Sequence, residues 1–276
     1  MGAPEPSLNL AVLERDFVTS NYGRNPMPDH RSLVRKPFVE RSPLQRHRKL
    51  QHEHREHHPH AVLVSEGNDG VESNFAAVFG PMTAGEFDDA TGRFFGGEPF
   101  AVVVESETAA DIEGFLQRQG WTLDEEEVAM VLTPIPDPPP SPPDLHIEMV
   151  ATDKSYRDFM RVVPGNRFWV PSLEAATDPD VGLLLGYVEG EPVVTSRLVR
   201  YREVAEITAV QVLETYRRRG YGRALTWAAI AEGRRRGCKT VILTATEMGY
   251  PLYLGMGFEE ICAYRTYLPP RGERGR

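Results

Sequence analysis

The amino-acid sequence predicts an α/β protein built on a mixed sheet. Strand-like and helix-like segments alternate through the second half of the chain, which favours a layered α/β fold. Two of the expected strands, 181–188 and 192–200, are separated by Glu189-Gly190-Glu191, a turn typical of an antiparallel hairpin. A strand–helix–strand order follows this hairpin, so we expect a mixed layer and not a strictly parallel one.

A proline-rich run, PIPDPPPSPPD at 134–144, divides the chain into two halves of similar length. Proline fixes φ and has no N–H to donate, so the run cannot join a helix or the interior of a sheet. It is expected to be an extended, semi-rigid spacer. We therefore expect an N-terminal domain at 1–134, a linker at 135–144 and a C-terminal domain at 145–276.

The C-terminal half has the clearer pattern of secondary structure. Its longest expected helix, 218–236, has apolar and small residues at helical spacing and is followed by Gly237, a residue favoured just after helix C-termini. Strands are expected at 145–151, 181–188, 192–200, 205–213, 240–245 and 258–268, and shorter helices at 155–163 and 251–256.

The N-terminal half is less regular, and its first 60 residues are polar, with no expected helix or strand. The rest of this half alternates as the second half does. Strands are expected at 61–65, 74–79, 100–104 and 128–133, and helices at 83–95 and 108–119.

Charge and composition exclude several classes of protein. The 276-residue chain has a net charge of −9, whereas nucleic-acid binding needs a clustered basic surface, so no nucleic-acid partner is expected. No signal peptide or membrane-spanning run is present, so no membrane partner is expected either. Cys238 and Cys262 lie in apolar stretches and are expected to be buried thiols in a reducing compartment. These features predict a cytoplasmic protein.

The most informative segment is RRRGYGRAL at 217–225, between an expected strand and the longest expected helix. N–H groups at a helix N-terminus are unpaired and lie at the positive end of the helix dipole. Glycines let a ligand approach the backbone, and arginines add charge-assisted hydrogen bonds. The segment predicts a pyrophosphate site, with a solvated glycine turn as the plainer alternative.

Two common phosphate-binding motifs do not fit this segment. A P-loop needs G-x-x-x-x-G-K-[ST], which is absent, and a dinucleotide fingerprint needs glycine or alanine at a position held here by leucine. Arg217-x-x-Gly220-x-Gly222 instead resembles the [Q/R]-x-x-G-x-[G/A] motif of the GNAT (GCN5-related N-acetyltransferase) superfamily.

The flanking segments resemble the same superfamily. The strand before the motif ends in VLETYRRRG, with Glu214 where proline is commoner, and Tyr253 followed by Leu-Gly-Met-Gly-Phe resembles the Y-x-x-x-G-F segment. The resemblance covers about 145–270. It implies a GNAT fold for the C-terminal half, acetyl-CoA as the co-substrate and no metal.

By this resemblance, the expected anion is the pyrophosphate of coenzyme A. The strand before the motif would splay from its neighbour to admit the pantetheine arm, and a backbone N–H near Val212 or Leu213 would polarise the thioester carbonyl. The residues implied to bind the cofactor are Val210, Val212, Leu213, Arg217, Arg218, Arg219, Gly220, Tyr221, Gly222 and Arg223.

The resemblance further implies direct acyl transfer to an amine. Tyr253 matches the general acid that protonates the leaving thiolate, with an aromatic packed beneath the last strand as the alternative. Glu206 is the candidate base, and Glu203 and Glu214 are its rivals. A solvated strand carboxylate is the plainer interpretation of each, and an amine that binds in its neutral form would need no base.

The two halves of the chain end alike. LQRQGW at 116–121 and YLGMGF at 253–258 are each followed by an expected strand and a proline. Leu116 stands where Tyr253 stands, and the first half lacks the Arg-x-x-Gly-x-Gly motif. The N-terminal half therefore resembles a degenerate GNAT copy, which would make this a tandem protein.

A histidine-rich tract at 46–60 holds six of the eight histidines. It has no apolar periodicity, and such tracts are often polar surface, so no metal site is expected there. The segment PGNRFWVPS at 164–172 is expected to line the acceptor site.

Together these features predict an acetyl-CoA-dependent N-acetyltransferase acting on a small-molecule amine. Two alternatives stay open: a coenzyme A-binding regulatory protein without turnover, and an acyltransferase acting on a protein or a charged tRNA. The acceptor, the acyl chain length and the oligomeric state are not decided by the sequence, and a homodimer is one option.

Overall fold

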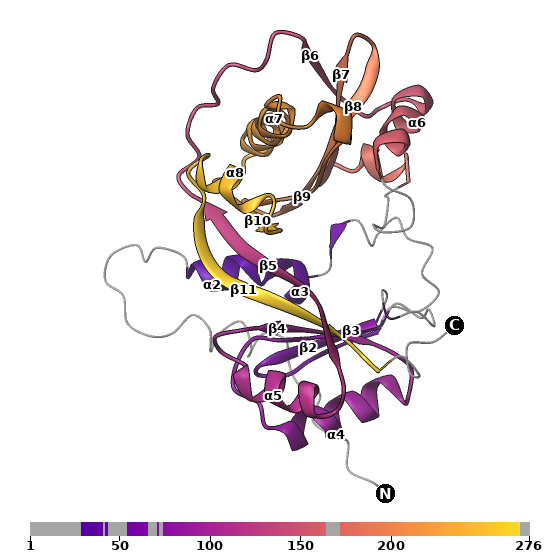
Figure 1. The fold of residues 1–276 in the computed structure, drawn as a ribbon, viewed down its shortest axis with the longest axis vertical. Helices are drawn as coiled ribbons and strands as arrows, with labels where there is room; N and C mark the ends of the chain where they lie inside the picture. The colour runs from indigo at the N-terminus through magenta and orange to yellow at the C-terminus, as the bar shows by residue number, and fades with distance from the viewer. Residues whose placement is uncertain are drawn as a thin grey trace, which may run out of the picture.

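A computed structural model describes residues 29–40, 42–43, 54–65, 71, 74–163 and 172–270. Within these ranges, eleven strands form one mixed sheet in the order β1-β2-β3-β4-β11-β5-β10-β9-β8-β7-β6, which confirms the expected fold class (Figure 1). The strands are β1 (His54–His57), β2 (Ala61–Ser65), β3 (Asn74–Val78), β4 (Ala101–Glu105), β5 (Thr122–Leu132), β6 (Leu145–Met149), β7 (Val181–Val188), β8 (Glu191–Tyr201), β9 (Val204–Val212), β10 (Thr240–Ala245) and β11 (Glu259–Leu268).

Helices cover both faces of this sheet. The first face carries α4 and α5 over the N-terminal strands and α7 and α8 over the C-terminal strands, and the opposite face carries α2, α3 and α6 (Figure 1). The helices are α2 (His30–Val34), α3 (Lys36–Val39), α4 (Ala84–Phe95), α5 (Ala110–Arg118), α6 (Asp153–Val162), α7 (Tyr221–Arg235) and α8 (Tyr250–Leu254), with short 3₁₀ turns at η2 (Ala175–Thr177) and η3 (Glu214–Tyr216). None of these helices is long and apolar enough to cross a membrane.

The last strand of each half is exchanged with the other half. β11 lies between β4 and β5, and β5 lies between β11 and β10, so each last strand contacts strands of the opposite half. The β5–β11 ladder runs from Glu259↔Val131 to Leu268↔Thr122. The two halves are therefore joined by backbone hydrogen bonds through the middle of one continuous sheet.

The same order of elements occurs in both halves. In the first, the strands β2 and β3 form a hairpin, and α4, β4, α5 and β5 follow; in the second, β8 and β9 form a hairpin, and α7, β10, α8 and β11 follow. In each half the strand after the long helix runs parallel to the strand before it. The N-terminal half thus repeats the C-terminal topology, as the degenerate copy predicted.

The structure differs from the sequence-based expectations in three places. β5 begins at Thr122 and not at 128. The acidic residues between these positions have no strand pattern in the sequence, but they pair with β11 in the structure. α7 begins at Tyr221 and not at 218, because Arg218 and Gly220 have positive φ values of 64° and 84°. The helices α2 and α3 and the strand β1 lie within the first 60 residues, where no element was expected.

α2 is fixed to the sheet by a buried ion pair. The Glu105 carboxylate on β4 is fully buried and accepts two hydrogen bonds of 2.8 Å from the Arg35 guanidinium, and Arg31 forms a second ion pair with it. A planar guanidinium suits such a bidentate contact. This pair holds α2 and α3 over the middle of the sheet, next to the exchanged strands.

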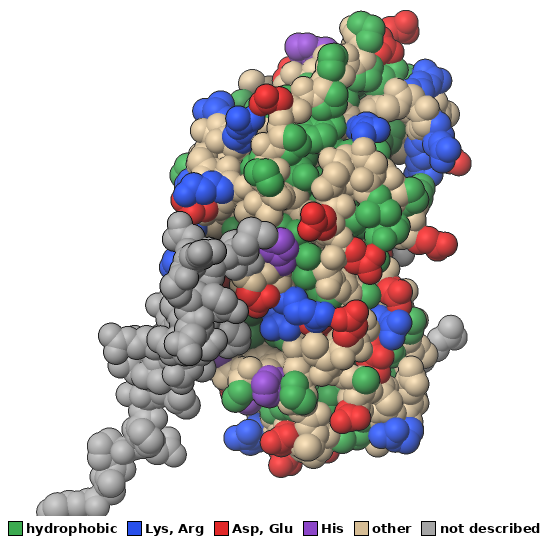
Figure 2. All heavy atoms as spheres, turned by 90° about the vertical axis from the view of Figure 1, so that its left-hand side faces the viewer, with side chains coloured by type: hydrophobic (Ala, Val, Ile, Leu, Met, Phe, Trp, Pro, Cys, Tyr) green, Lys and Arg blue, Asp and Glu red, His purple; other side chains and the backbone are tan. Residues whose placement is uncertain are grey.

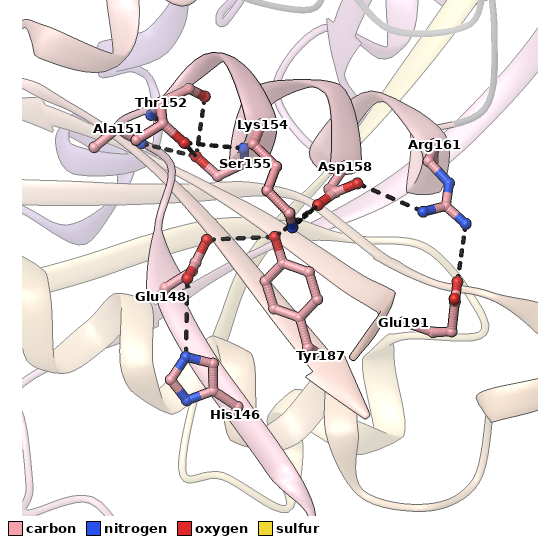
Figure 3. Close-up of polar contacts among 10 residues, drawn as sticks. All are labelled: His146, Glu148, Ala151, Thr152, Lys154, Ser155, Asp158, Arg161, Tyr187 and Glu191. Carbon is pink, nitrogen blue, oxygen red and sulfur yellow. Dashed lines mark hydrogen bonds and ion pairs between the residues drawn. The ribbon is translucent and has the colours of Figure 1, made fainter. Parts of the chain in front are cut away.

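α6 is anchored at the opposite end of the same face. Its N-terminus has a capping box between Thr152 and Ser155. Asp158 pairs with Lys154 at 2.7 Å and accepts a hydrogen bond of 3.2 Å from the Tyr187 hydroxyl on β7 (Figure 3). The Tyr187 hydroxyl also lies 3.3 Å from a Glu148 oxygen on the edge strand β6. These contacts position α6 independently of the exchanged strands.

The strand exchange predicts that the halves stay together when the linker is cut. Residues 136–141 are exposed, so a specific protease site placed there should be cleaved without loss of the fold. The cleaved chain should elute from a sizing column as one species of the intact mass, and separate only after denaturation. Two separate species under native conditions would contradict the exchange.

Candidate active site

The site begins where two parallel strands part. β9 and β10 pair only at Val204↔Thr240, Ala205↔Val241 and Glu206↔Ile242, although β9 continues to Val212. Beyond these pairs, the backbone groups of β9 that face β10 have no strand to bind. The expected splay is therefore present, and among the described residues no strand pairs with this edge of β9 beyond Glu206.

The register of β9 shows which backbone groups face this gap. The Leu213 N–H donates to the Val193 carbonyl at 3.0 Å, and Val212 pairs with Val194 on β8. Because hydrogen-bonded and non-hydrogen-bonded pairs alternate in an antiparallel ladder, Val212 is in a non-hydrogen-bonded pair and its N–H points away from β8. A bulge at Ala209, with φ of 52°, precedes this end of the strand, and Val210 lies on the same side as Val212.

The loop after β9 presents a row of free N–H groups. Within the described part of the chain, the N–H groups of residues 218–223 donate to no backbone carbonyl, and α7 has no side-chain cap. Gly220 has φ of 84°, which favours glycine. A Cβ on Gly222 would lie 3.3 Å from Val212 Cγ2, so this glycine keeps the loop close to the strand end. The segment has the form of an anion site at a helix N-terminus.

The side chains around the loop hold its shape. The Arg217 Nε donates to the Val212 carbonyl at 3.2 Å, and the Arg219 guanidinium lies 5.2 Å from the centre of the Tyr216 ring. Tyr221 at the start of α7 donates to the Asp144 carboxylate. The guanidinium of Arg223 donates to the Gly255 carbonyl, which ties the loop to the end of α8.

Tyr253 lies on α8, the helix that follows β10, and belongs to the core cluster that α7 covers. Its side chain is buried, its ring contacts the edge of Phe258 at a centroid distance of 5.8 Å, and a Cβ on Gly249 would lie 3.0 Å from the ring. Burial, with a smaller contribution from the Glu127 carboxylate, raises the pKa of Tyr253 to about 12. The phenol is therefore protonated at neutral pH and can act as a proton donor.

Glu206 lines a cavity on the sheet face covered by α2 and α3. The cavity has a volume of about 170 Å³ and is lined by Val34, Pro37, Phe38, Val103, Glu127, Glu206, Ile242, Leu243, Thr244, Tyr264 and Thr266. Burial raises the pKa of Glu206 from 4.5 to about 7, while Arg197 and a hydrogen bond of 3.4 Å from the Tyr201 hydroxyl act against this rise. A carboxylate with this pKa can accept a proton near neutral pH.

Glu127 is a second carboxylate in this cavity that the sequence-based prediction missed. It lies on the exchanged strand β5, directly opposite Tyr264 of β11. Burial raises its pKa, the neighbouring Glu125 adds to the rise, and a hydrogen bond from the Thr244 hydroxyl opposes it. Only the strand order brings Glu127 to the site, so no local pattern in the sequence could have identified it.

The rival base candidates lie outside this cavity. Glu203 is exposed and pairs with Lys239 at 2.6 Å, and Glu214 is exposed in the turn after β9. Of the expected acceptor wall at 164–172, all but Ser172 lies outside the described residues, as does the first part of the histidine-rich tract. The part of the chain that is described holds no group of three or more potential metal ligands.

The N-terminus of α4, which corresponds to that of α7, has no room for an anion. At the start of α4, the Thr83 hydroxyl accepts from the Glu86 N–H, and the Glu86 carboxylate accepts from the Thr83 N–H at 2.9 Å. A carboxylate thus already occupies the position at which an anion would bind. β3 and β4 stay paired from Phe75↔Ala101 to Val78↔Val104, so no gap opens between them.

Comparison with known proteins identifies the fold of this site. Residues 161–258 match the model of the acetyltransferase (GNAT) family, so this segment is a GNAT domain. The resemblance based on the Arg-x-x-Gly-x-Gly motif is thereby confirmed. The GNAT family implies acyl transfer from an acyl-coenzyme A. No curated protein matches the chain significantly.

Solved structures extend the likeness to most of the chain. A GCN5-related N-acetyltransferase from Kribbella flavida is 17% identical, with a TM-score of 0.69 over 89% of this chain and 97% of that chain. A GCN5-related N-acetyltransferase-like protein from Streptococcus suis is 16% identical, with a TM-score of 0.53 over 88% and 99%. A tandem GNAT protein from the clavulanic acid biosynthesis pathway is 12% identical, with a TM-score of 0.50 over 75% and 78%. At these identities the likeness shows the fold.

The raised pKa of Glu206 predicts how stability depends on pH. The folded chain binds a proton at this site up to about pH 7, whereas the unfolded chain releases it near pH 4.5. The free energy of unfolding should therefore fall as the pH rises between these values, by up to about 3 kcal/mol. In Glu206→Gln the free energy of unfolding should not fall in this pH range. Chemical unfolding at pH 8 should therefore show that the variant is more stable than the wild type.

The exposed Glu214→Gln is the control for this measurement, because it changes the net charge equally. Its stability should follow that of the wild type at every pH. If Glu206→Gln also follows the wild type between pH 4.5 and 8, the Glu206 carboxyl titrates as an ordinary exposed group.

Proposed function

We propose that this protein transfers an acetyl group from acetyl-CoA to the amine of a small molecule. The observation that carries the proposal is the combination of the parted strands β9 and β10 with the free N–H groups of residues 218–223 at one end of the gap. An extended thiol cofactor with a pyrophosphate needs both: backbone groups along its arm and donors around its phosphates.

The residues of the proposed cofactor site have distinct roles. The N–H groups of 218–223, with Arg218, Arg219 and Arg223 around them, would bind the pyrophosphate. Val210 and Val212 would pair with the pantetheine arm through their backbone groups. The N–H of Leu213 already donates to Val193 and is therefore not free to act as the oxyanion donor, whereas the N–H groups of Val210 and Val212 lie on the side away from β8.

The chemistry would be a direct attack of the amine on the thioester carbonyl. Glu206 takes a proton from the amine as the C–N bond forms, and a backbone N–H on the free edge of β9 stabilises the negative charge on the carbonyl oxygen. The C–S bond then breaks, and the Tyr253 hydroxyl gives its proton to the leaving sulfur. Glu206 loses its proton to water and Tyr253 regains one, which restores the starting state.

The surface agrees with a small acceptor. On the face shown in Figure 2, Lys and Arg side chains are interspersed with Asp and Glu side chains, and no broad basic patch is visible. A charged tRNA would need such a patch. The cavity beside Glu206, at about 170 Å³, suits a small molecule.

A thermal-shift titration with acetyl-CoA tests the binding part of this proposal. A ligand at one hundred times its Kd stabilises the native state by about 2.7 kcal/mol, which a melting curve detects. We expect a shift with acetyl-CoA, and none of similar size with NADH or ATP at the same concentration. If the folded protein shows no change in melting temperature with acetyl-CoA, the proposed cofactor site is refuted.

Replacing Tyr253 separates binding from catalysis. Tyr253→Phe should keep acetyl-CoA binding and lower kcat by about 10²-fold or more, because a general acid contributes at least that factor. Thiol release with a panel of primary amines measures the rate. The control is Tyr250→Phe on the same helix, which removes a hydroxyl that bonds to Glu260 on β11 and should leave kcat unchanged. Equal rates for Tyr253→Phe and wild type would remove Tyr253 as the acid.

Replacing Gly220 tests the anion site. Gly220→Glu should abolish acetyl-CoA binding, because it puts a carboxylate at the N-terminus of α7. The matched control is Gly237→Glu at the other end of α7, where φ is 89° and a Cβ would meet open space. Both variants carry the same backbone strain and charge, so binding should be lost only in Gly220→Glu. Loss of binding in both, or in neither, argues against the site.

A further inference from the structure

The N-terminal half supplies a carboxylate to the active site of the other half. Glu127 belongs to the first half of the chain, yet β5 enters the sheet between β11 and β10, two strands from Glu206 on β9. Both side chains line the same cavity of about 170 Å³. The negative charge of Glu127 acts on Glu206 and also on Tyr253, so it lies near both candidate catalytic groups.

Among the described residues, the Arg197 guanidinium acts on Glu206, and the groups that act on Glu127 include no cation. Arg197 and Tyr201 on β8 face Glu206, Thr244 and Glu125 are next to Glu127, and Tyr264 forms part of the wall. Arg31 on α2 and Arg35, between α2 and α3, bind the separate buried carboxylate of Glu105. Two carboxylates in one enclosed space repel each other and lose solvation, and a bound cation relieves both effects.

We propose that Glu127 and Glu206 together bind the acceptor as its ammonium form, with Glu127 as a positioning and specificity-determining residue donated by the N-terminal half. This inference rests on the proposed function, whose acceptor class it names: a small primary amine that is positively charged at neutral pH. The apolar side chains of Val34, Pro37 and Phe38, on α2 and α3, would contact its carbon skeleton.

Proton transfer through Glu206 accounts for the two protons that the ammonium must lose, and the third stays on the amide nitrogen. The bound ammonium gives one proton to Glu206, which passes it to water, and the amine becomes a nucleophile. Glu206 then takes the second proton as the C–N bond forms. In this cycle Glu127 exchanges no proton; it acts by holding the nitrogen and by keeping the proton affinity of Glu206 high.

The exchanged strand explains why the degenerate half would be retained. The N-terminal half has a closed anion corner and a leucine, Leu116, where the second half has Tyr253. It nevertheless provides β5 with Glu127, and the helices α2 and α3 that enclose the cavity. Its contribution is therefore to the acceptor side of the site and not to the cofactor side.

Carboxyl NMR of the full chain with ¹³C-labelled glutamate tests the coupling without any turnover. The Glu206 resonance, assigned with Glu206→Gln, should titrate near pH 7 in the wild type. In Glu127→Gln its midpoint should move to lower pH, because a neighbouring negative charge has been removed. The exposed Asp124→Asn, on the same strand, should leave the midpoint in place. An unmoved midpoint in Glu127→Gln would overturn the pairing.

The charge of the ligand is tested with a matched pair of probes. n-Propylamine, charged at pH 7, should perturb both carboxyl resonances of the wild type, whereas the neutral n-propanol should not. Equal responses to the two probes would refute a cation site. In turnover with primary amines, Glu127→Gln should raise KM about tenfold with a smaller change in kcat, as for a lost hydrogen bond to a charged group. Asp124→Asn should leave KM unchanged.

The outcomes separate this inference from the proposed function. If acetyl-CoA binds and amines are acetylated but Glu127→Gln changes neither KM nor the Glu206 midpoint, the proposed function stands and the role of Glu127 is wrong. If acetyl-CoA does not bind, the NMR titrations still decide whether the two carboxylates form a cation site.

Discussion

The parting of β9 and β10 after three residue pairs is the constraint on which the rest of the site depends. Backbone polar groups inside a sheet must be paired, so two strands that separate leave donors and acceptors for something else to satisfy. The bulge at Ala209 turns the end of β9, and the loop behind it leaves its N–H groups free. A strand edge and a helix N-terminus, both with backbone N–H groups that bond to no carbonyl among the described residues, thereby lie next to each other.

The exchange of β5 and β11 gives this surface its second side. β5 lies between β10 and β11, the last two strands of the C-terminal half, so that half cannot form its full sheet without the N-terminal half. The same exchange brings the Glu127 carboxylate and the wall formed by α2 and α3 to Glu206. Fold completion and assembly of the proposed acceptor site thus depend on the same strand exchange.

The sequence predicted the features of this site that are encoded locally. The spacing of Arg217, Gly220 and Gly222 indicated the anion corner, and helix periodicity indicated α7, because both depend on neighbouring residues. Glu206 was one of several candidate carboxylates, and only its burial in the structure distinguishes it from Glu203. The position of Glu127 could not be predicted, because it depends on the strand order of a sheet that both halves share.

Amide hydrogen exchange with and without acetyl-CoA tests the central claim most directly, because that claim concerns particular N–H groups. If acetyl-CoA lies along β9 and its pyrophosphate binds the loop, peptides covering 210–213 and 218–223 should exchange more slowly when it is added, while the start of α4 should be unaffected. Protection confined to other parts of the chain, or none at all, would contradict the account.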